Sequence, residues 1–107
     1  MSTPQKFRKL PVIVEAMQVP EGGQSQGNLM HWIRNHGGGV TAYDYAVKRY
    51  EKPLSDGSYY QWTSLSIGTL EGRMSARVGD WIVRGIRGEF YPVKRAIFDA
   101  TYEAVQQ

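Results

Sequence analysis

Residues 69–103 have the sequence TLEGRMSARVGDWIVRGIRGEFYPVKRAIFDATYE, which predicts two successive hairpins followed by one short amphipathic helix. The first turn is expected at Glu71-Gly72 and the second at residues 85–88 (GIRG), because glycine adopts the backbone angles that tight turns need. The helix is expected over residues 96–102, since apolar side chains recur there at near-helical spacing.

The chain before this region adds strands and one further helix. A strand is predicted over residues 11–19, which are rich in β-branched side chains. More strand is predicted over residues 40–50 and 59–70. Between them, a helix is predicted over residues 29–35, with Asn28 as its N-cap and three glycines at its end.

This order of elements indicates the fold class. Strands that pair with near neighbours, with helices set apart from them, favour an α+β fold with a mostly antiparallel sheet and two short helices. Five or six strands in so small a protein can also curl into a partly open barrel. Trp81 and Phe90, on opposite arms of the second hairpin, are predicted to share one core with Ile82 or Val83. At 107 residues we expect a single domain, with residues 1–5 as a loose tail.

The composition is typical of a soluble globular protein, with 41% apolar and 21% charged residues and a net charge of +3. The absence of cysteine excludes a disulfide framework, a thiolate nucleophile and a cysteine-ligated metal. No apolar run approaches the length of a membrane span, and the first ten residues lack the apolar core of a signal peptide. We therefore expect a cytoplasmic protein without a membrane partner.

The residues that usually carry catalysis are poorly placed for it. His31 and His36 are five positions apart on the predicted helix, so they point about 140° apart and cannot form an i, i+4 metal pair. The serines lie in strand and turn contexts without the elbow motif of a nucleophile. Asp80 and Glu89 are expected to face each other across the second hairpin, where acids near arginines usually form surface ion pairs. The sequence therefore predicts no enzyme, no metal and no cofactor.

Basic and aromatic residues are interleaved in the second half of the chain. A curved sheet that carries arginines and aromatic rings is typical of proteins that hold single-stranded nucleic acid. The same residue types dominate protein–protein hot spots, and arginines on hairpins can also serve only to keep a sheet edge soluble. The candidate binding residues are Arg73, Arg77, Arg84, Arg87, Lys94 and Arg95, with Tyr59, Tyr60 and Tyr91. The residues alone leave these three interpretations open.

Within this set, the second hairpin is the strongest candidate surface. Arg84 and Arg87 bracket its turn, Tyr91 follows, and Lys94 and Arg95 lie beyond it. We expect the turn to bring these side chains together, so that guanidinium groups bind carboxylate or phosphate while the tyrosine adds apolar contact. Function is then predicted to depend on an exposed hairpin surface and not on a buried pocket.

Several stretches of the chain form a distinctive set: KFRKLPVIVEAMQ at residues 6–18, TLEG at 69–72, GDWIV at 79–83, GIRGEFYP at 85–92, IF at 97–98 and TYE at 101–103. Together they resemble a widespread family of small tailed-phage and prophage proteins. Members often carry a Cys-Lys-Pro-Asp-like run where this chain has Val93-Lys94-Arg95-Ala96. Any role of that cysteine is therefore missing here, and Ala96 replaces an aspartate that could cap the final helix.

The resemblance implies a phage accessory protein that acts in the host cytoplasm by binding a host protein, to modulate it or to blunt a defence. One alternative is a nucleic-acid-binding protein that uses the arginines and aromatics of the hairpins. Another is a sponge for a small anionic ligand, held by arginines at the interface of a homo-oligomer. Salt-dependent binding to random DNA or RNA would distinguish the nucleic-acid binder from the others.

Overall fold

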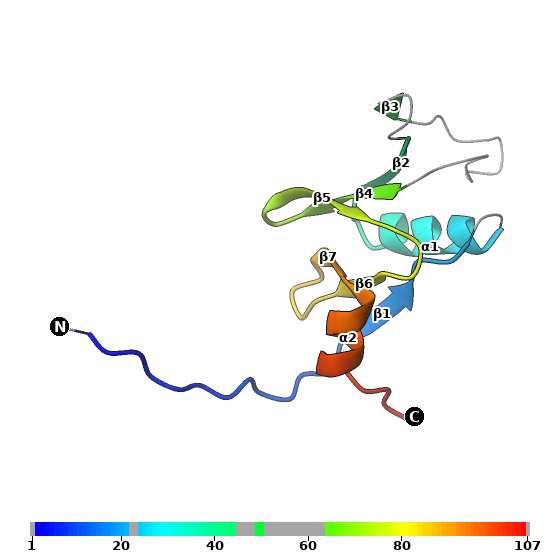
Figure 1. The fold of residues 1–107 in the computed structure, drawn as a ribbon. Coiled ribbons are helices and arrows are strands. Elements are labelled where there is room, and N and C mark those ends of the chain that lie inside the picture. Colours follow the sequence, from blue (N-terminus) through cyan, green and yellow to red (C-terminus); the bar gives the residue numbers. More distant parts are fainter. Residues whose placement is uncertain (1, 22–23, 45–48, 51–63, 107) are drawn as a thin grey trace.

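A computed structural model of the protein describes residues 2–21, 24–44, 49–50 and 64–106 (Figure 1). Its elements, in chain order, are β1 (Glu15–Gln18), α1 (Gln24–Asn35), β2 (Val40–Asp44), β3 (Arg49–Tyr50), β4 (Ser64–Thr69), β5 (Gly72–Ala76), β6 (Trp81–Arg84), β7 (Phe90–Val93) and α2 (Arg95–Thr101). The strand predicted over residues 59–63, which includes Tyr59 and Tyr60, lies outside the described residues.

The described strands form two antiparallel sheets. One has the order β1-β6-β7 and the other β3-β2-β4-β5. The prediction of an α+β fold with antiparallel sheet and two helices is therefore confirmed. The described strands do not close into a barrel, because no hydrogen-bonded strand pair joins the two sheets.

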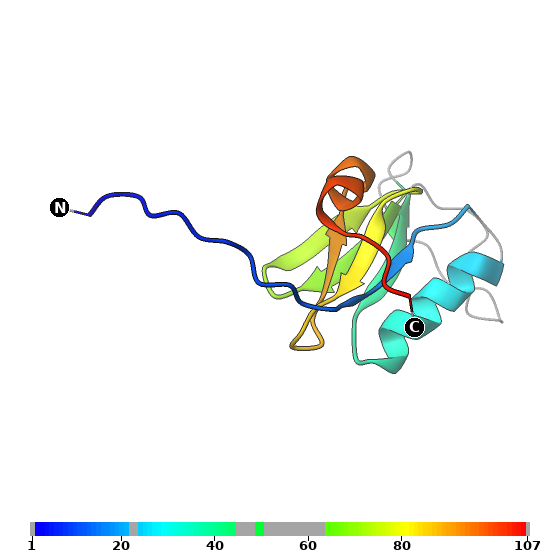
Figure 2. The ribbon, with the colours of Figure 1, turned by 90° about the horizontal axis from the view of Figure 1, so that it is seen from below.

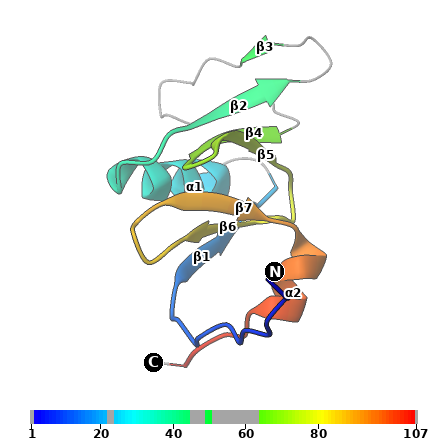
Figure 3. The ribbon, with the colours of Figure 1, turned by 90° about the vertical axis from the view of Figure 1, so that its left-hand side faces the viewer.

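The core lies where α1 meets the inner faces of both sheets. Figures 1 and 3 show α1 between the sheet of β4 and β5 and the sheet of β1 and β6. The cluster of buried apolar residues consists of Leu29, Met30 and Ile33 from α1, Val40, Leu65, Ile67 and Ala76 from the larger sheet, Ile82 and Phe90 from the smaller sheet, and Val19. One continuous core therefore holds the two sheets together.

The first helix starts earlier than predicted. It begins at Gln24, so Asn28 lies inside the helix and is not its N-cap. Tertiary contact explains the extra turn: Gln26 is only 4% exposed, and its amide donates a hydrogen bond to the carbonyl oxygen of Pro20. Packing thus stabilises a turn whose residues give no helix signal. The helix ends at Asn35, ahead of the glycines, as predicted.

Two predicted strands differ from those in the structure. β1 covers only the last part of the segment predicted over residues 11–19, because its partner β6 has four residues and then turns. The segment predicted as one strand over residues 40–50 contains two, β2 and β3, which pair antiparallel. Alternation of period two is the same in one strand as in two paired strands, so the pattern could not reveal the reversal.

Residues 2–14 contain neither helix nor strand, and they leave the body as an extended arm (Figures 1 and 2). The loose tail predicted over residues 1–5 is therefore the end of a longer segment. Within the arm, Phe7, Leu10 and Ile13 are exposed at 87%, 77% and 78%. We call residues 2–14 the N-terminal arm.

Both predicted hairpins are present. β4 and β5 reverse at Leu70-Glu71, one residue earlier than expected, with Gly72 opposite Thr69. β6 and β7 reverse over residues 85–88 as predicted, and Gly88 has a φ of +80°. Such a positive φ is strained for any residue with a Cβ.

The two faces of the second hairpin carry different aromatic residues. Phe90 is opposite Arg84 in the register, whereas Trp81 lies three positions from Arg84 and so points to the other face. The prediction that Trp81 shares the core of Phe90 is therefore wrong. Trp81 stacks instead on Phe98 of α2, with ring centroids 4.2 Å apart.

The helix α2 covers this outer face. It begins at Arg95, and Lys94 occupies the N-cap position without a side-chain hydrogen bond. Ala96 is therefore the second residue of the helix and not its cap, contrary to expectation. Phe98 and Tyr102 stack along the helix with centroids 4.7 Å apart, which adds a small aromatic cluster to the fold.

Candidate functional site

The tips of the two hairpins lie at the same end of the molecule (Figures 1 and 3). Between them is a groove of about 340 Å³. It is lined by Thr69, Leu70, Glu71 and Met74 from the first hairpin and by Glu89, Phe90, Tyr91 and Pro92 from the second. We call this the inter-hairpin groove.

The walls of the inter-hairpin groove are mainly apolar and partly open to solvent. Leu70 is 73% exposed at the first turn, and Met74 on β5 is 44% exposed. Across from them, Phe90 is buried at 2% and forms the floor of the groove where it meets the core. Exposed apolar side chains that gather around a concavity are typical of a binding surface.

One glutamate from each hairpin, Glu71 or Glu89, lines the groove. Glu71 belongs to the first turn, which two hydrogen bonds stabilise. The backbone N–H of Glu71 donates to Thr69 Oγ1 (3.1 Å), and the Thr69 hydroxyl donates to the carbonyl oxygen of Gly72 (2.6 Å). Glu89 precedes β7, and its Oε1 accepts a hydrogen bond from the backbone N–H of Arg87. The two glutamates therefore favour a cationic group next to an apolar one.

Both strands that border the groove are edge strands in the described sheets, β5 in the larger and β7 in the smaller. Edge strands leave a row of backbone donors and acceptors without a neighbouring strand. Pro92 lies on β7, where a residue without an N–H is tolerated because the strand is at an edge.

The residues predicted to form one binding surface are not gathered in one place. Arg84 Nη1 lies 3.1 Å from Glu15 Oε1 of β1, and the Arg84 Nε atom is buried without a hydrogen-bond partner. Arg87 is exposed on the turn itself. Of this pair, Arg87 is on the open surface, whereas Arg84 connects two strands of the smaller sheet.

Lys94 and Arg95 lie at the far end of β7, away from the turn. Lys94 Nζ is 3.8 Å from Asp80 Oδ2 there, and Asp80 also accepts a hydrogen bond from the backbone N–H of Arg77 at 3.0 Å. Asp80 is therefore a buried structural acceptor at the base of the hairpin. The expectation that Asp80 and Glu89 face each other is wrong, because they lie at opposite ends of it.

Tyr91 points to the outer face of the smaller sheet. Its hydroxyl lies 3.4 Å from the hydroxyl of Tyr102, beside the aromatic cluster of α2. Burial raises the pKa of Tyr91 above its usual value near 10.0, and the hydrogen bond and charge of Tyr102 and the charge of Glu89 act in the same direction. The Tyr91 hydroxyl therefore helps to hold α2 on the sheet and is not free to bind a partner.

Arg73 is part of the larger sheet. Its Nε donates a hydrogen bond of 2.8 Å to Ser66 Oγ on the neighbouring strand, so the guanidinium group lies across the sheet surface. Tyr59 and Tyr60 lie outside the described residues. The structure thus distributes the predicted basic residues over several regions.

Of the candidate binding residues predicted from the sequence, Tyr91 lines the groove, and the other groove residues were missed. One residue in the sequence could have indicated the groove. Leu70 is an apolar residue in a two-residue turn, where polar or small residues are usual. Met74 and Leu70 lie in the first hairpin and Glu89 in the second, and nothing in their spacing indicates that the two hairpins from different sheets meet.

Other kinds of site find no support in the described residues. Among them, no group of three or more His, Asp or Glu side chains could hold a metal ion. His36 Nδ1 is 2.8 Å from the carbonyl oxygen of Trp32 and closes the end of α1. No helix in the described part of the chain is long and apolar enough to cross a membrane.

No family model, no curated protein and no solved structure matches the chain.

Proposed function

We propose that this chain is a small, non-catalytic binding protein that receives an extended segment of a protein partner in the inter-hairpin groove. The observation that carries the proposal is the groove itself, in which exposed Leu70 and Met74 face Phe90 and Pro92 between two edge strands. Edge strands and apolar pockets together are the usual means of binding an extended peptide.

The chemistry of the groove defines the segment that fits it. A volume of about 340 Å³ is at the lower end for ligand clefts, so it accommodates apolar side chains and not a folded element. Glu71 and Glu89 in its lining favour basic residues beside the apolar anchor. The expected segment therefore has a large apolar residue flanked by lysine or arginine.

The resemblance to small tailed-phage proteins supports a host protein as the partner and the host cytoplasm as the place of action. In that setting, the captured segment would belong to a host enzyme or to a defence protein. The resemblance supplies this context, and the groove supplies the mode of binding.

The two alternatives, a nucleic-acid binder and a sponge for a small anionic ligand, both need a site lined by cations, and they receive less support from the geometry. A nucleic-acid groove would be lined by cations, whereas the lining here includes Glu71 and Glu89. Arg84 and Lys94 already have carboxylate partners, and Arg73 is hydrogen bonded within its own sheet. We therefore expect no tight, salt-dependent binding of random single-stranded DNA or RNA at the groove.

The test compares two pairs of substitutions. Leu70→Glu with Met74→Glu places charges in the groove, and Val78→Glu with Ile97→Glu places them on similarly exposed apolar residues elsewhere, which are 49% and 58% exposed. Each pair should change the free energy of unfolding by only about 0.5 kcal/mol per site. Tagged proteins are then used to capture partners from host lysate, with identification by mass spectrometry.

We expect the groove pair to capture at least about tenfold less partner than the wild type, since apolar anchors dominate such interfaces. The control pair should capture as much as the wild type. Equal capture by the groove pair and the wild type would show that the groove is not the binding site.

A further inference from the structure

The N-terminal arm has the chemistry that the groove favours. Phe7 is 87% exposed and lies between Lys6 and Arg8, which are also exposed. In an extended chain, successive side chains point to opposite sides, so Phe7 can enter an apolar pocket while both cations stay at its rim. An apolar anchor between two basic residues matches a groove that has an apolar floor and one glutamate from each hairpin among its lining residues.

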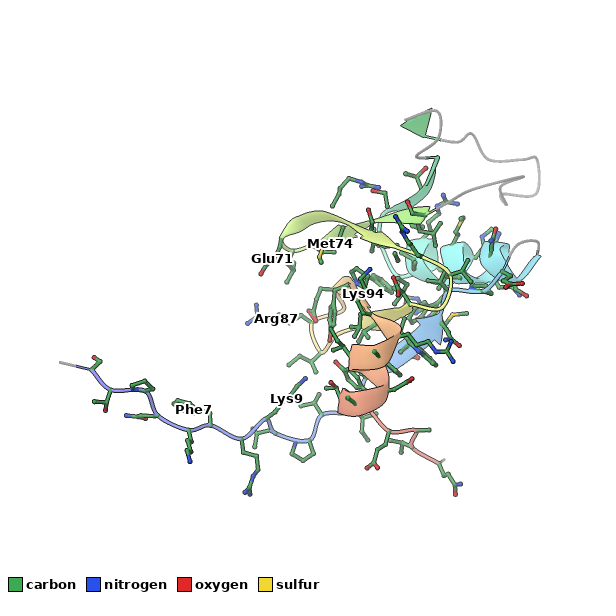
Figure 4. All side chains as sticks on the ribbon, viewed as in Figure 1. Phe7, Lys9, Glu71, Met74, Arg87 and Lys94 are labelled. Carbon is green, nitrogen blue, oxygen red and sulfur yellow. The ribbon has the colours of Figure 1, made fainter. Side chains whose placement is uncertain are left out.

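The arm is not placed to reach the groove of its own chain. It continues β1, which is one edge of the smaller sheet, whereas the groove borders β7 at the opposite edge. Near the body, Lys9 Nζ lies 5.3 Å from the ring centroid of Tyr102, the residue after α2, and this contact holds the middle of the arm near the end of that helix. Figures 1 and 2 show the arm running away from the body, and Figure 4 shows Phe7 on it.

The sequence of the arm also favours this direction. Pro11 fixes its own backbone angle, and Val12, Ile13 and Val14 are β-branched residues that prefer extended conformations. A sharp reversal toward β7 would have to form within these residues. Residues 2–8 can extend roughly 20 Å beyond them, which is enough to cross the groove of a neighbouring molecule.

We propose that the N-terminal arm of one copy of this chain docks in the inter-hairpin groove of a second copy, with Phe7 against Leu70, Met74 and Phe90. Lys6 and Arg8 then lie beside Glu71 and Glu89 of that second copy. The proposal rests on the proposed function, because it names one occupant of the same groove. A host segment of the same chemistry competes with the arm for the groove.

The charge pairing allows a direct test on the intact protein. A carbodiimide forms an amide bond between a lysine amine and a nearby carboxylate, with loss of water, and adds no spacer. Unlabelled and ¹⁵N-labelled copies are mixed, cross-linked and digested, and mass spectrometry then distinguishes links within one copy from links between copies. The Lys94–Asp80 pair, 3.8 Å apart in one chain, is an internal control that should give links within one copy only.

We expect links between copies that join Lys6 to Glu71 or Glu89. Phe7→Ala keeps the amine and both carboxylates, so it should reduce these links by at least about tenfold if Phe7 is the anchor. Glu71→Gln with Glu89→Gln should abolish them. In sedimentation experiments, wild type should self-associate at concentrations at which the Phe7→Ala variant is monomeric.

Three results would overturn the proposal: links from Lys6 that stay within one copy, links between copies that Phe7→Ala leaves unchanged, or a wild type that is monomeric throughout. None of these three results requires the capture of a partner from lysate. If Leu70→Glu with Met74→Glu abolishes partner capture while no Lys6 links form between copies, the groove is a binding site but the arm is not its occupant. If Lys6 links form and capture is unaffected, the arm docks but the proposed function fails.

Discussion

Arg84 illustrates how one side chain can look exposed in the sequence and be structural in the fold. Its side chain is 32% exposed and its Nη1 is 3.1 Å from Glu15 Oε1. Arg84→Glu would put two carboxylates next to each other between β1 and β6. We expect the free energy of unfolding to fall by about 1–2 kcal/mol in urea denaturation.

Arg87→Glu is the matched control, because Arg87 is exposed on the turn of the same hairpin. Its effect on the free energy of unfolding should stay below about 0.5 kcal/mol. Equal stability of the two variants would contradict the assigned role of Arg84. Only the Arg87 variant can therefore test recognition at this hairpin without a loss of stability.

Tyr91 should make stability depend on pH in the alkaline range. Burial and Tyr102 raise its pKa in the folded state, whereas in the unfolded chain it ionises near its usual value of 10.0. Above that pH the unfolded state binds fewer protons than the folded state, so this contribution to stability is present below pH 10 and is lost as the pH rises further. Tyr91→Phe should therefore lose less stability than wild type between about pH 8 and pH 11.

The measurement is urea denaturation of both proteins at the two pH values. At pH 8 the substitution itself should cost less than about 1 kcal/mol, because the Tyr91–Tyr102 hydroxyl distance of 3.4 Å indicates a weak hydrogen bond. An identical loss in the two proteins would show that the Tyr91 phenol does not carry this effect.

At the scale of elements, the end of α1 is fixed by a close approach to β7. A Cβ added at Gly38 would lie 2.6 Å from Ile33 Cγ2 and 2.6 Å from Phe90 Cδ2, and both of these side chains are in the core. Gly38→Ala should therefore lower the free energy of unfolding by about 1–3 kcal/mol. Gly39→Ala is the control, since the nearest atom to its Cβ would be Arg73 Nη1 at 3.7 Å.

Gly38→Ala also moves Phe90, which is the floor of the groove. We expect this variant to lose partner capture as well as stability, whereas Gly39→Ala should retain both. Normal stability of Gly38→Ala in thermal or urea unfolding would show that helix and strand can separate at this point without cost.

The elements themselves were predicted well where local chemistry determines them. The glycine turns and the apolar runs beside them gave both hairpins, and the spacing of Phe98 and Tyr102 gave α2 to within one residue. The start of α1 was missed because buried Gln26, and not a capping residue, stabilises its first turn. The β2–β3 reversal was missed because apolar and polar residues alternate in the same way in one long strand and in two paired strands.

At the scale of the whole molecule, the binding residues were only partly predictable. The sequence identified the second hairpin, and Arg87 does lie exposed on its turn. It could not separate the two faces of that hairpin, so it did not show that the Tyr91 hydroxyl lies beside Tyr102 while Tyr91 also lines the groove. The groove depends on the meeting of two hairpins from different sheets, and no local pattern encodes that arrangement.

The central claim is that an extended segment binds between the hairpin tips. The most direct measurement places a photoreactive phenylalanine analogue at Leu70, in the groove, and in a second protein at Ile97, on α2. The two positions are 73% and 58% exposed, so their general reactivity should be similar. After irradiation in cell lysate, covalent adducts are digested and the attached peptides are sequenced by mass spectrometry.

The structure predicts at least about tenfold more adduct from position 70 than from position 97, attached to segments with an apolar residue between basic ones. The Lys6-Phe7-Arg8 segment of a second copy belongs to this class. Equal yields from the two positions, or adducts from position 70 on unrelated folded surfaces, would contradict the assignment of the inter-hairpin groove as the binding site.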